Sequence, residues 1–258
     1  MIKAVFCDID GTLVSFKTHQ VAQSTIDALA VLREKGVKVF VATGRHYQAI
    51  NNLDGLTFDG YITLNGSYCL AGTSEVIYKH AIPQADVQSV ISFIEEQEAF
   101  PCAFVHERES FINYIDDNTH QLFDLINYPK PPIAPLQQAL EGDVFQMMAF
   151  FNAELESKVM PLIPGCQATR WNPISADITP AGGSKQVGID KIIAHFGIDL
   201  SETMAFGDGG NDVSMLRHAA IGVAMGNANE DVKQSADYVT DTVDDDGIYK
   251  ALKHFGVL

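Results

Sequence analysis

Asp8 and Asp10 stand one residue apart, directly after the apolar run 4–7 and directly before Gly11. The run has the length and composition of a short buried strand. Two carboxylates at the end of a strand repel each other, and a divalent cation is the simplest way to neutralise them. In a parallel sheet this edge is also where ligands bind. The stretch therefore predicts metal-assisted chemistry, although a hydrophilic turn would have the same composition.

Three further groups of polar residues occupy similar positions, at the end of a predicted strand or the start of a predicted helix. They are Thr43, Gly44 and Arg45; Ser184 and Lys185; and Asp208, Asn211 and Asp212. Because the carboxyl ends of parallel strands meet at one edge, we expect these groups to converge. Carboxylates would hold Mg²⁺, while a hydroxyl, an ammonium and backbone N–H groups exposed by glycines would bind phosphate oxygens. The combination predicts a phosphoryl-transfer site.

Each of these residues also has a simpler structural interpretation. Lys185 and Arg45 could be solvated surface cations. The Thr43 hydroxyl could bond to backbone at the end of its strand. Asn211 and Asp212 could cap the helix that follows them, which is compatible with a role in the site.

The elements between these groups alternate between strand and helix, which predicts a parallel sheet with right-handed crossovers. Asn65 and Gly66 close the third strand, and Asn229 and the acids 244–246 precede helices that they could cap. The expected strands are 4–7, 37–42, 60–64, 203–206, 221–225 and 238–240, with a hairpin over 69–79, helices over 24–35 and 185–196, and helical sequence over 46–53.

Residues 83–181 have a different pattern, in which helices accompany paired strands. We expect helices over 85–97, 118–126 and 154–162, and strands over 102–106, 144–151, 167–171 and 176–178. Such a pattern predicts an α+β layer with its own core. The predicted fold class is α/β, with a Rossmann-like doubly wound parallel-sheet core formed by residues 1–82 and 182–258 and an inserted α+β cap formed by residues 83–181.

The composition is that of a soluble globular protein, with 47% hydrophobic and 19% charged residues. The chain begins without a secretory signal pattern, and four cysteines lie far apart, so we expect buried free thiols and a cytoplasmic location. A formal net charge of −16 repels nucleic acid and anionic membranes. The expected partner is a small phosphorylated metabolite, attracted by local cations, and the chain is expected to be a monomer or homodimer.

Four stretches carry a family resemblance by their order and spacing: Asp8-Ile-Asp-Gly-Thr-Leu13, Ala42-Thr-Gly-Arg45, Gly183-Ser-Lys185 and Gly207-Asp-Gly-Gly-Asn-Asp-Val-Ser-Met-Leu216. They resemble the haloacid dehalogenase (HAD) superfamily of phosphatases, and within it the Cof-type sugar-phosphate phosphatases with a C2B-type α/β cap. The resemblance covers the whole chain, including the insert. It implies Mg²⁺-dependent hydrolysis of small phosphate monoesters, above all hexose or pentose phosphates.

The resemblance also implies a role for each residue. Asp8 would be the nucleophile that forms an aspartyl-phosphate, with Asp10 as general acid and base. Mg²⁺ would be held by Asp8, the backbone carbonyl of Asp10 and Asp208, with Asp212 as a direct or water-mediated ligand. Thr43 and Lys185 would take part in catalysis by holding the phosphoryl group. The expected substrate-binding residues are Thr43, Gly44, Arg45, Asn65, Lys185 and Asn211.

The cap is expected to contact the alcohol part of the ester. Its candidate residues are His106, Glu107, Arg108, Asn113, Tyr114, Arg170 and Trp171, together with Arg45, Asn65 and Gly66 of the core, although surface or packing roles would also explain the cap residues. Two other functions remain open. A phosphomutase would use the same aspartyl-phosphate, and a non-enzymatic phospho-receiver module would use a phosphorylated aspartate as a switch.

Overall fold

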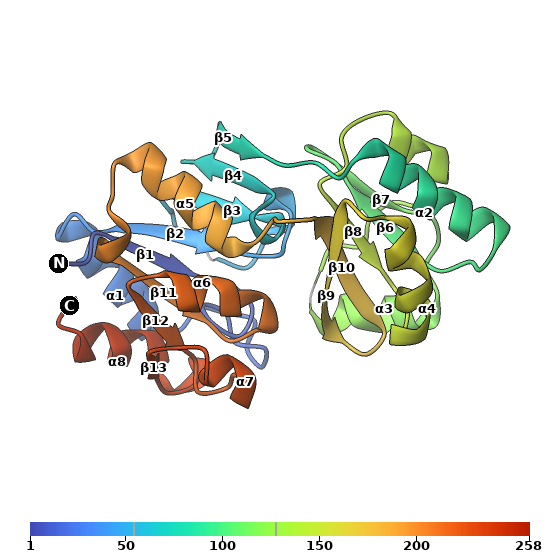
Figure 1. The fold of residues 1–258 in the computed structure, drawn as a ribbon. Coiled ribbons are helices and arrows are strands. Elements are labelled where there is room, and N and C mark those ends of the chain that lie inside the picture. The colour runs from blue at the N-terminus through green and yellow to red at the C-terminus, as the bar shows by residue number, and fades with distance from the viewer. Residues whose placement is uncertain (54, 127) are drawn as a thin grey trace. The chain divides into compact units, whose positions relative to one another are not determined.

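Figure 1 shows a computed structural model of the chain, which describes residues 1–53, 55–126 and 128–258, and only the backbone at Trp171. The chain divides into two compact units. The first consists of Met1–Tyr78 and Ser184–Leu258, and the second of Lys79–Gly183. The predicted insert, residues 83–181, lies within the second unit.

The first unit is built on an eight-stranded sheet in the order β13-β12-β11-β1-β2-β3-β4-β5. Its strands are β1 Ala4–Cys7, β2 Lys38–Ala42, β3 Gly60–Thr63, β4 Tyr68–Ala71, β5 Glu75–Lys79, β11 Thr203–Gly207, β12 Ile221–Ala224 and β13 Tyr238–Val239. The pairings from β13 to β3 are parallel, and β4 joins β3 antiparallel. The predicted α/β fold class is confirmed.

Helices cover this sheet because its central strands are apolar on both faces. All four residues of β1 are buried, as a strand between two helical layers requires. Phe6 and Phe40 stack at 5.0 Å between ring centroids and share a core with Ile189 of α5 and Leu216 of α6. The helices of this unit are α1 Gln23–Glu34, α5 Lys185–Phe196, α6 Val213–His218, α7 Glu230–Lys233 and α8 Gly247–His254.

The second unit contains a five-stranded antiparallel sheet in the order β7-β6-β8-β10-β9. Its elements are α2 Gln84–Glu96, β6 Cys102–Val105, β7 Ser110–Ile112, α3 Asp117–Leu125, β8 Gln146–Ala149, α4 Ala153–Val159, β9 Cys166–Asn172 and β10 Ser175–Pro180. Apolar side chains of α2 and α4 pack with Phe104, Met147 and Ile178 of the sheet in one core. Figure 1 shows α2 and α4 beside this sheet.

Several local predictions were wrong. Residues 46–53 form only a short 3₁₀ helix, Tyr47–Ala49, because the two asparagines that follow are weak helix formers. The α-helix expected over 154–162 ends at Val159 and continues as a 3₁₀ turn, since Pro161 lacks the N–H that an α-helix needs. The strand β7 was not expected.

The two predicted helix caps were also wrong. Asn229 stands at the N-cap of α7 and Asp246 at the N-cap of α8, but neither side chain accepts a capping hydrogen bond. Asp246 instead accepts from Ser24, and Asp244 accepts from Ser15 at 2.6 Å. These two hydrogen bonds therefore connect Ser15 and α1 to the residues that directly precede α8. All four cysteines are buried and free.

Candidate active site

Asp8 and Lys185 meet in a buried ion pair at the carboxyl edge of the first sheet. Asp8 follows β1 and is 6% exposed, and its Oδ1 lies 2.6 Å from Lys185 Nζ. Lys185 is the first residue of α5, whose preceding residue, Ser184, caps the helix by accepting from Val187 N–H. Lys185 is fully buried, so its interpretation as a solvated cation is wrong.

Asp212 holds the same ammonium from the other side. Its Oδ1 lies 2.5 Å from Lys185 Nζ, and its Oδ2 accepts from the backbone N–H groups of Asp208 and Gly209 at 2.9 and 2.8 Å. The bond to Gly209 caps the short 3₁₀ helix Gly210–Asp212. Both carboxylate oxygens of Asp212 are therefore engaged within the protein, which suits a residue that positions Lys185 and the Asp208 loop.

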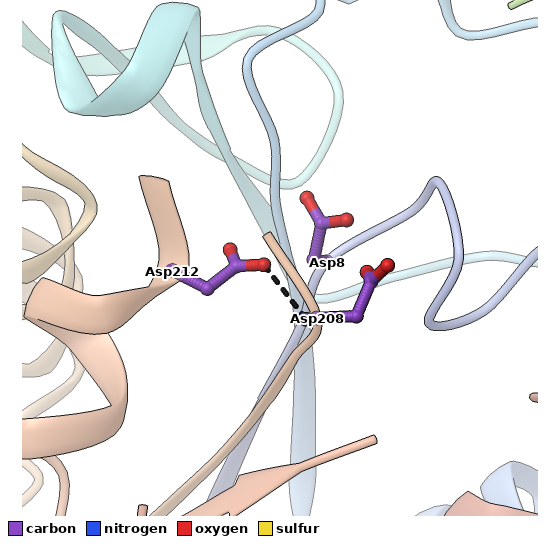
Figure 2. Close-up of side chains that lie close together, drawn as sticks. All are labelled: Asp8, Asp208 and Asp212. Carbon is purple, nitrogen blue, oxygen red and sulfur yellow. Dashed lines mark hydrogen bonds between the residues drawn. The ribbon is translucent and has the colours of Figure 1, made fainter. Parts of the chain in front are cut away.

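Asp208 follows β11, the strand next to β1, and completes a group of three carboxylates. One ligand atom each from Asp8, Asp208 and Asp212 lies within 4.8 Å of the others, and Figure 2 shows the three side chains together with the bond from Asp212 to the Asp208 backbone. The Thr12 hydroxyl donates to Asp208 Oδ1 at 2.9 Å and Asn227 Nδ2 donates to Oδ2 at 3.2 Å. This cluster could hold a divalent cation, because carboxylate oxygens are ligands that Mg²⁺ prefers.

Burial and mutual repulsion perturb these acids. Burial raises the pKa of Asp8 well above its usual range, Lys185 opposes this rise, and the neighbouring carboxylates add to it. The pKa of Asp208 is raised to about 7, first by burial and then by Asp212. Burial alone would lower the pKa of Lys185, but the charges of Asp212 and Asp8 outweigh it and raise that pKa. A bound cation would relieve the repulsion among the carboxylates.

Asp10 lies beside this cluster but is bound by a different cation. Arg45 donates to both of its carboxylate oxygens, from Nε to Oδ2 at 2.7 Å and from Nη2 to Oδ1 at 2.8 Å. Arg45 is 5% exposed, so it is not an ordinary surface cation. The Thr43 hydroxyl oxygen accepts a hydrogen bond from the Arg45 backbone N–H at 3.1 Å, which confirms the expected bond between this hydroxyl and the backbone. The hydroxyl proton of Thr43 can still be donated to another group.

The Asn65 turn brings the start of α5 against the sheet edge. Asn65 and Gly66 both have positive φ, of 54° and 96°, and a side chain on Gly66 would collide with the backbone of Ser184. Asn211 Nδ2 donates to Asn65 Oδ1 at 2.9 Å, and the same Asn65 side chain lies against Gly44. The predicted residues Gly44, Asn65 and Asn211 are therefore brought together.

The cap candidates have varied positions within the second unit. His106, Glu107 and Arg108 line a hollow of about 360 Å³. Asn113 bonds to backbone groups of Cys102 and Phe100, and the backbone N–H of Tyr114 donates to Asn113 Oδ1. Because the bonds of Asn113 serve the local fold, we no longer assign it to substrate binding.

Arg170 is also committed to its own unit. It donates from Nε and Nη2 to Glu156 and from Nη1 to backbone carbonyls, among them that of Phe151. We therefore withdraw it as a substrate-binding candidate. The side chain of Trp171 lies outside what the structure describes.

Sequence reasoning missed Asn227. Besides contacting Asp208, its Nδ2 donates to the backbone carbonyl of Gly11 at 2.9 Å, and its Oδ1 accepts from Val243 N–H. Asn227 lies in the loop that follows β12, a strand parallel to β11. The same rule that grouped the other residues, that loops after parallel strands share an edge, could have found it.

Three carboxylates and a buried ammonium lie together at one edge of the sheet in this α/β core. Such an arrangement is typical of an enzyme active site. A model of the haloacid dehalogenase-like hydrolase family matches residues 5–252. The chain belongs to this family, which confirms the resemblance of its four motifs and makes it a hydrolase rather than a non-enzymatic receiver module.

Similar proteins match over almost the whole chain. A solved HAD subclass IIB sugar phosphatase is 52% identical, with a TM-score of 0.93 over 99% of this chain and 100% of that one. A HAD-superfamily phosphatase from Bacteroides thetaiotaomicron is 44% identical, with a TM-score of 0.92 over 100% and 96% of the two chains. The Bacillus subtilis protein named "Putative phosphatase YkrA" is 34% identical, over 99% of this chain and 98% of its own length.

Proposed function

We propose that the chain is a Mg²⁺-dependent phosphatase that hydrolyses small phosphate monoesters, chiefly sugar phosphates, through an aspartyl-phosphate on Asp8. The observation that carries the proposal is the buried pairing of Asp8 with Lys185 at 2.6 Å beside Asp208. A carboxylate can attack phosphorus only where the negative charge of the ester is neutralised. The sugar phosphatase at 52% identity supports the substrate class.

The donor set fits Mg²⁺, a hard cation that takes oxygen ligands. The carboxylates of Asp8 and Asp208 would hold it, with the backbone carbonyl of Asp10 as the family resemblance implies. Asp212 would support them by holding Lys185 and the Asp208 backbone. When bound, Mg²⁺ would neutralise charge on the phosphoryl oxygens and so permit the approach of a carboxylate.

The residues of the chain would carry out two displacements. In the first, an Asp8 oxygen forms a bond to phosphorus as the bond to the ester oxygen breaks, and Asp10 gives its proton to the departing alcohol. In the second, Asp10 takes a proton from water, the water oxygen attacks phosphorus, and inorganic phosphate leaves Asp8. An ammonium has three N–H donors, of which two contact Asp8 and Asp212, so Lys185 and the Thr43 hydroxyl would hold the phosphoryl oxygens.

Selection of the alcohol is assigned to the second unit, which we propose acts as the cap. A cytoplasmic location is proposed because four free thiols suit a reducing compartment.

Phosphate release from a panel of phosphorylated hexoses, pentoses, nucleotides and cofactors, with and without Mg²⁺, tests the proposal. We expect Mg²⁺-dependent release that is abolished in Asp8→Asn, which keeps the shape of the side chain. Release that survives this substitution, or its absence for every ester, would refute the proposal. Isomerised product without free phosphate would identify a phosphomutase instead.

A further inference from the structure

The aromatic ring of Phe16 lies beside the carboxylate of Asp208, although the Phe16 side chain is 51% exposed. The backbone of Gly11 shows how close the two groups are. Gly11 has a φ of 87°, and a Cβ added to it would collide with Asp208 Oδ2 and lie 2.8 Å from Phe16 Cε2. The ring and the carboxylate therefore lie against the same point of the backbone. A carboxylate that is placed to hold a cation thus has an apolar group next to it.

The loop that carries Phe16 is closed at its base. A single exposed aromatic side chain is common on protein surfaces and indicates nothing by itself. Here, however, Val14 forms one β-bridge with Asp10 and another with Val21. These two bridges close residues 14–21 into a loop that begins directly at the proposed site. The position of the ring is therefore defined relative to the carboxylates.

Asp244 anchors this loop on both sides of Phe16. The hydroxyl of Ser15, a buried residue, donates to Asp244 Oδ1 at 2.6 Å, and Lys17 Nζ lies 2.7 Å from Asp244 Oδ2. The Lys17 backbone N–H also donates to the Ser15 hydroxyl oxygen at 3.0 Å. A surface ion pair contributes little by itself, but here one carboxylate binds the residues before and after Phe16. The anchor therefore restricts the positions that the ring can take.

The segment that contains Asp244 also positions Asn227. Val243, the residue before Asp244, donates its N–H to Asn227 Oδ1 at 2.9 Å. Asn227 Nδ2 in turn donates to the carbonyl of Gly11 and to Asp208 Oδ2. One segment thus holds two different groups at the same carboxylate, an amide directly and an aromatic ring through the loop. The amide orients the carboxylate by hydrogen bonding, whereas the ring supplies an apolar surface.

An apolar surface beside a metal site controls how much water reaches it. The attraction between a cation and carboxylates grows as water is excluded, because the effective dielectric constant falls. Mg²⁺ gives up its bound waters reluctantly. An apolar ring beside one of its ligands would therefore slow the exchange of those waters and strengthen the binding of the ion.

We infer that Phe16 shields the metal site from water on the side of Asp208, and that Asp244 is a positioning residue that holds the ring there through Ser15 and Lys17. The inference rests on the proposed function, because it requires that the carboxylates bind a divalent cation. It adds to that site two residues, Phe16 and Asp244, that lie outside the four sequence motifs.

Binding of Mn²⁺, a paramagnetic substitute for Mg²⁺, tests the inference without catalysis. The relaxation of water protons reports how freely water exchanges on the bound ion, and a titration gives the dissociation constant of Mn²⁺. In Phe16→Ala we expect this constant to rise about 3-fold to 10-fold, less than for groups that hydrogen-bond to a metal ligand. The relaxation enhancement per bound ion should also rise. Phe16→Leu keeps an apolar side chain and should stay close to the wild type in both quantities.

Matched controls separate this role from a general effect on the surface. Tyr249, on α8, is another partly exposed aromatic residue, and Tyr249→Ala should change neither quantity. Asp244→Ala should shift both quantities in the same direction as Phe16→Ala. Asp245→Ala should not, because the Asp245 carboxylate accepts only from the Thr242 hydroxyl among the hydrogen bonds of the described residues. The double variant Phe16→Ala/Asp244→Ala should match Phe16→Ala, since residues that act as one unit are not additive.

The inference is overturned if Phe16→Ala keeps the wild-type dissociation constant and relaxation enhancement, or if the wild-type protein binds no Mn²⁺. If Phe16→Ala does not fold, the two aspartate variants decide, and equal Mn²⁺ binding in Asp244→Ala and Asp245→Ala overturns the inference. A further loss of affinity in the double variant would refute the positioning role of Asp244, because this residue would then act through Val243 and Asn227.

Failure of the proposed phosphatase function would look different. The wild-type protein would then bind Mn²⁺ but release phosphate from none of the esters in the panel. The measurements of Mn²⁺ affinity and water relaxation would still decide whether Phe16 shields the ion.

Discussion

Arg45 binds Asp10 through two parallel hydrogen bonds, from Nε to Oδ2 at 2.7 Å and from Nη2 to Oδ1 at 2.8 Å. A third bond, from Nη1 to the backbone carbonyl of Ala49 at 3.3 Å, anchors the buried guanidinium. The two-pronged geometry fixes the plane of the carboxylate as well as its position. Arg45 is thus a positioning residue for the proposed acid and base.

Replacing Arg45 by lysine should therefore damage proton transfer. Lysine keeps the charge but lacks the planar guanidinium that binds both carboxylate oxygens. We therefore expect kcat for an alkyl phosphate to fall about 10-fold to 100-fold, which is part of the rate enhancement that a general acid contributes. The loss for p-nitrophenyl phosphate should be smaller, because nitrophenolate leaves without a proton. Steady-state kinetics with both esters check this, and equal losses would contradict a role through Asp10. The exposed Arg33→Lys is the control.

Asn227 should affect metal binding more than chemistry. It holds Asp208 Oδ2 and the Gly11 carbonyl, and the Val243 N–H holds its own amide oxygen. Groups that orient a metal ligand typically contribute about 10-fold or more to metal affinity. In Asn227→Ala we expect the Mg²⁺ concentration for half-maximal activity to rise by about that factor, with kcat recovering at high Mg²⁺.

The matched control for this prediction is Asn229→Ala, two residues further along the same loop. The Asn229 side chain makes no capping hydrogen bond, so its removal should leave the Mg²⁺ requirement as it is. If Asn227→Ala and Asn229→Ala need similar Mg²⁺ concentrations for half-maximal activity, Asn227 does not orient the metal site.

The stability of the metal-free protein should fall as the pH rises. Burial raises the pKa of Asp208 to about 7, whereas the group titrates near 3.9 in an unfolded chain. The folded protein therefore binds the Asp208 proton more tightly than the unfolded chain does. The stability that this proton contributes is fully present below the unfolded pKa and is lost as the pH rises through about 7. Mg²⁺ needs the carboxylate form, so its stabilising effect should grow over the same range.

Thermal denaturation with and without Mg²⁺ at pH 5.5 and pH 8 measures this effect. The rise in the unfolding midpoint caused by Mg²⁺ should be small at the lower pH and several degrees larger at the higher one, about the size expected for a few kcal/mol of binding. Asp208→Asn should abolish most of the difference. A Mg²⁺ effect that decreases with pH would contradict the proposed site.

Gly66 should be intolerant of a side chain. Its φ of 96° is unfavourable for other residues, and an added Cβ would collide with the backbone of Ser184, which caps the helix that carries Lys185. We expect Gly66→Ala to lower both the free energy of unfolding and kcat. Gly72→Ala separates the two causes, because Gly72 also has positive φ, of 57°, but has open space around it. Gly72→Ala should lose only about 1–2 kcal/mol of stability and keep the wild-type kcat. If Gly66→Ala and Gly72→Ala change kcat equally, the collision with Ser184 does not affect catalysis.

The amino-acid sequence by itself determined the doubly wound core and the edge at which chemistry could occur. Apolar runs mark buried strands, helices between them make those strands parallel, and residues such as Asp8, Thr43 and Asp208 that follow the runs must then share an edge. This reasoning is local, because it needs only the period of the pattern and the handedness of the crossovers. It also placed Lys185 at the start of a helix, because the helical pattern over 185–196 begins at that residue.

Only the tertiary structure decided which side chains meet and which do not. Asp212 binds Lys185 and Arg45 binds Asp10 across gaps of 27 and 35 residues, and Asn227 reaches Gly11 from a loop 216 residues away. The sequence alone does not distinguish Arg170 from Arg45, because both are arginines near predicted strands. In the structure, Arg170 binds Glu156 within its own unit, whereas Arg45 binds Asp10. Hydrogen-bond partners depend on packing that brings distant segments within about 3 Å, and no local pattern encodes that distance.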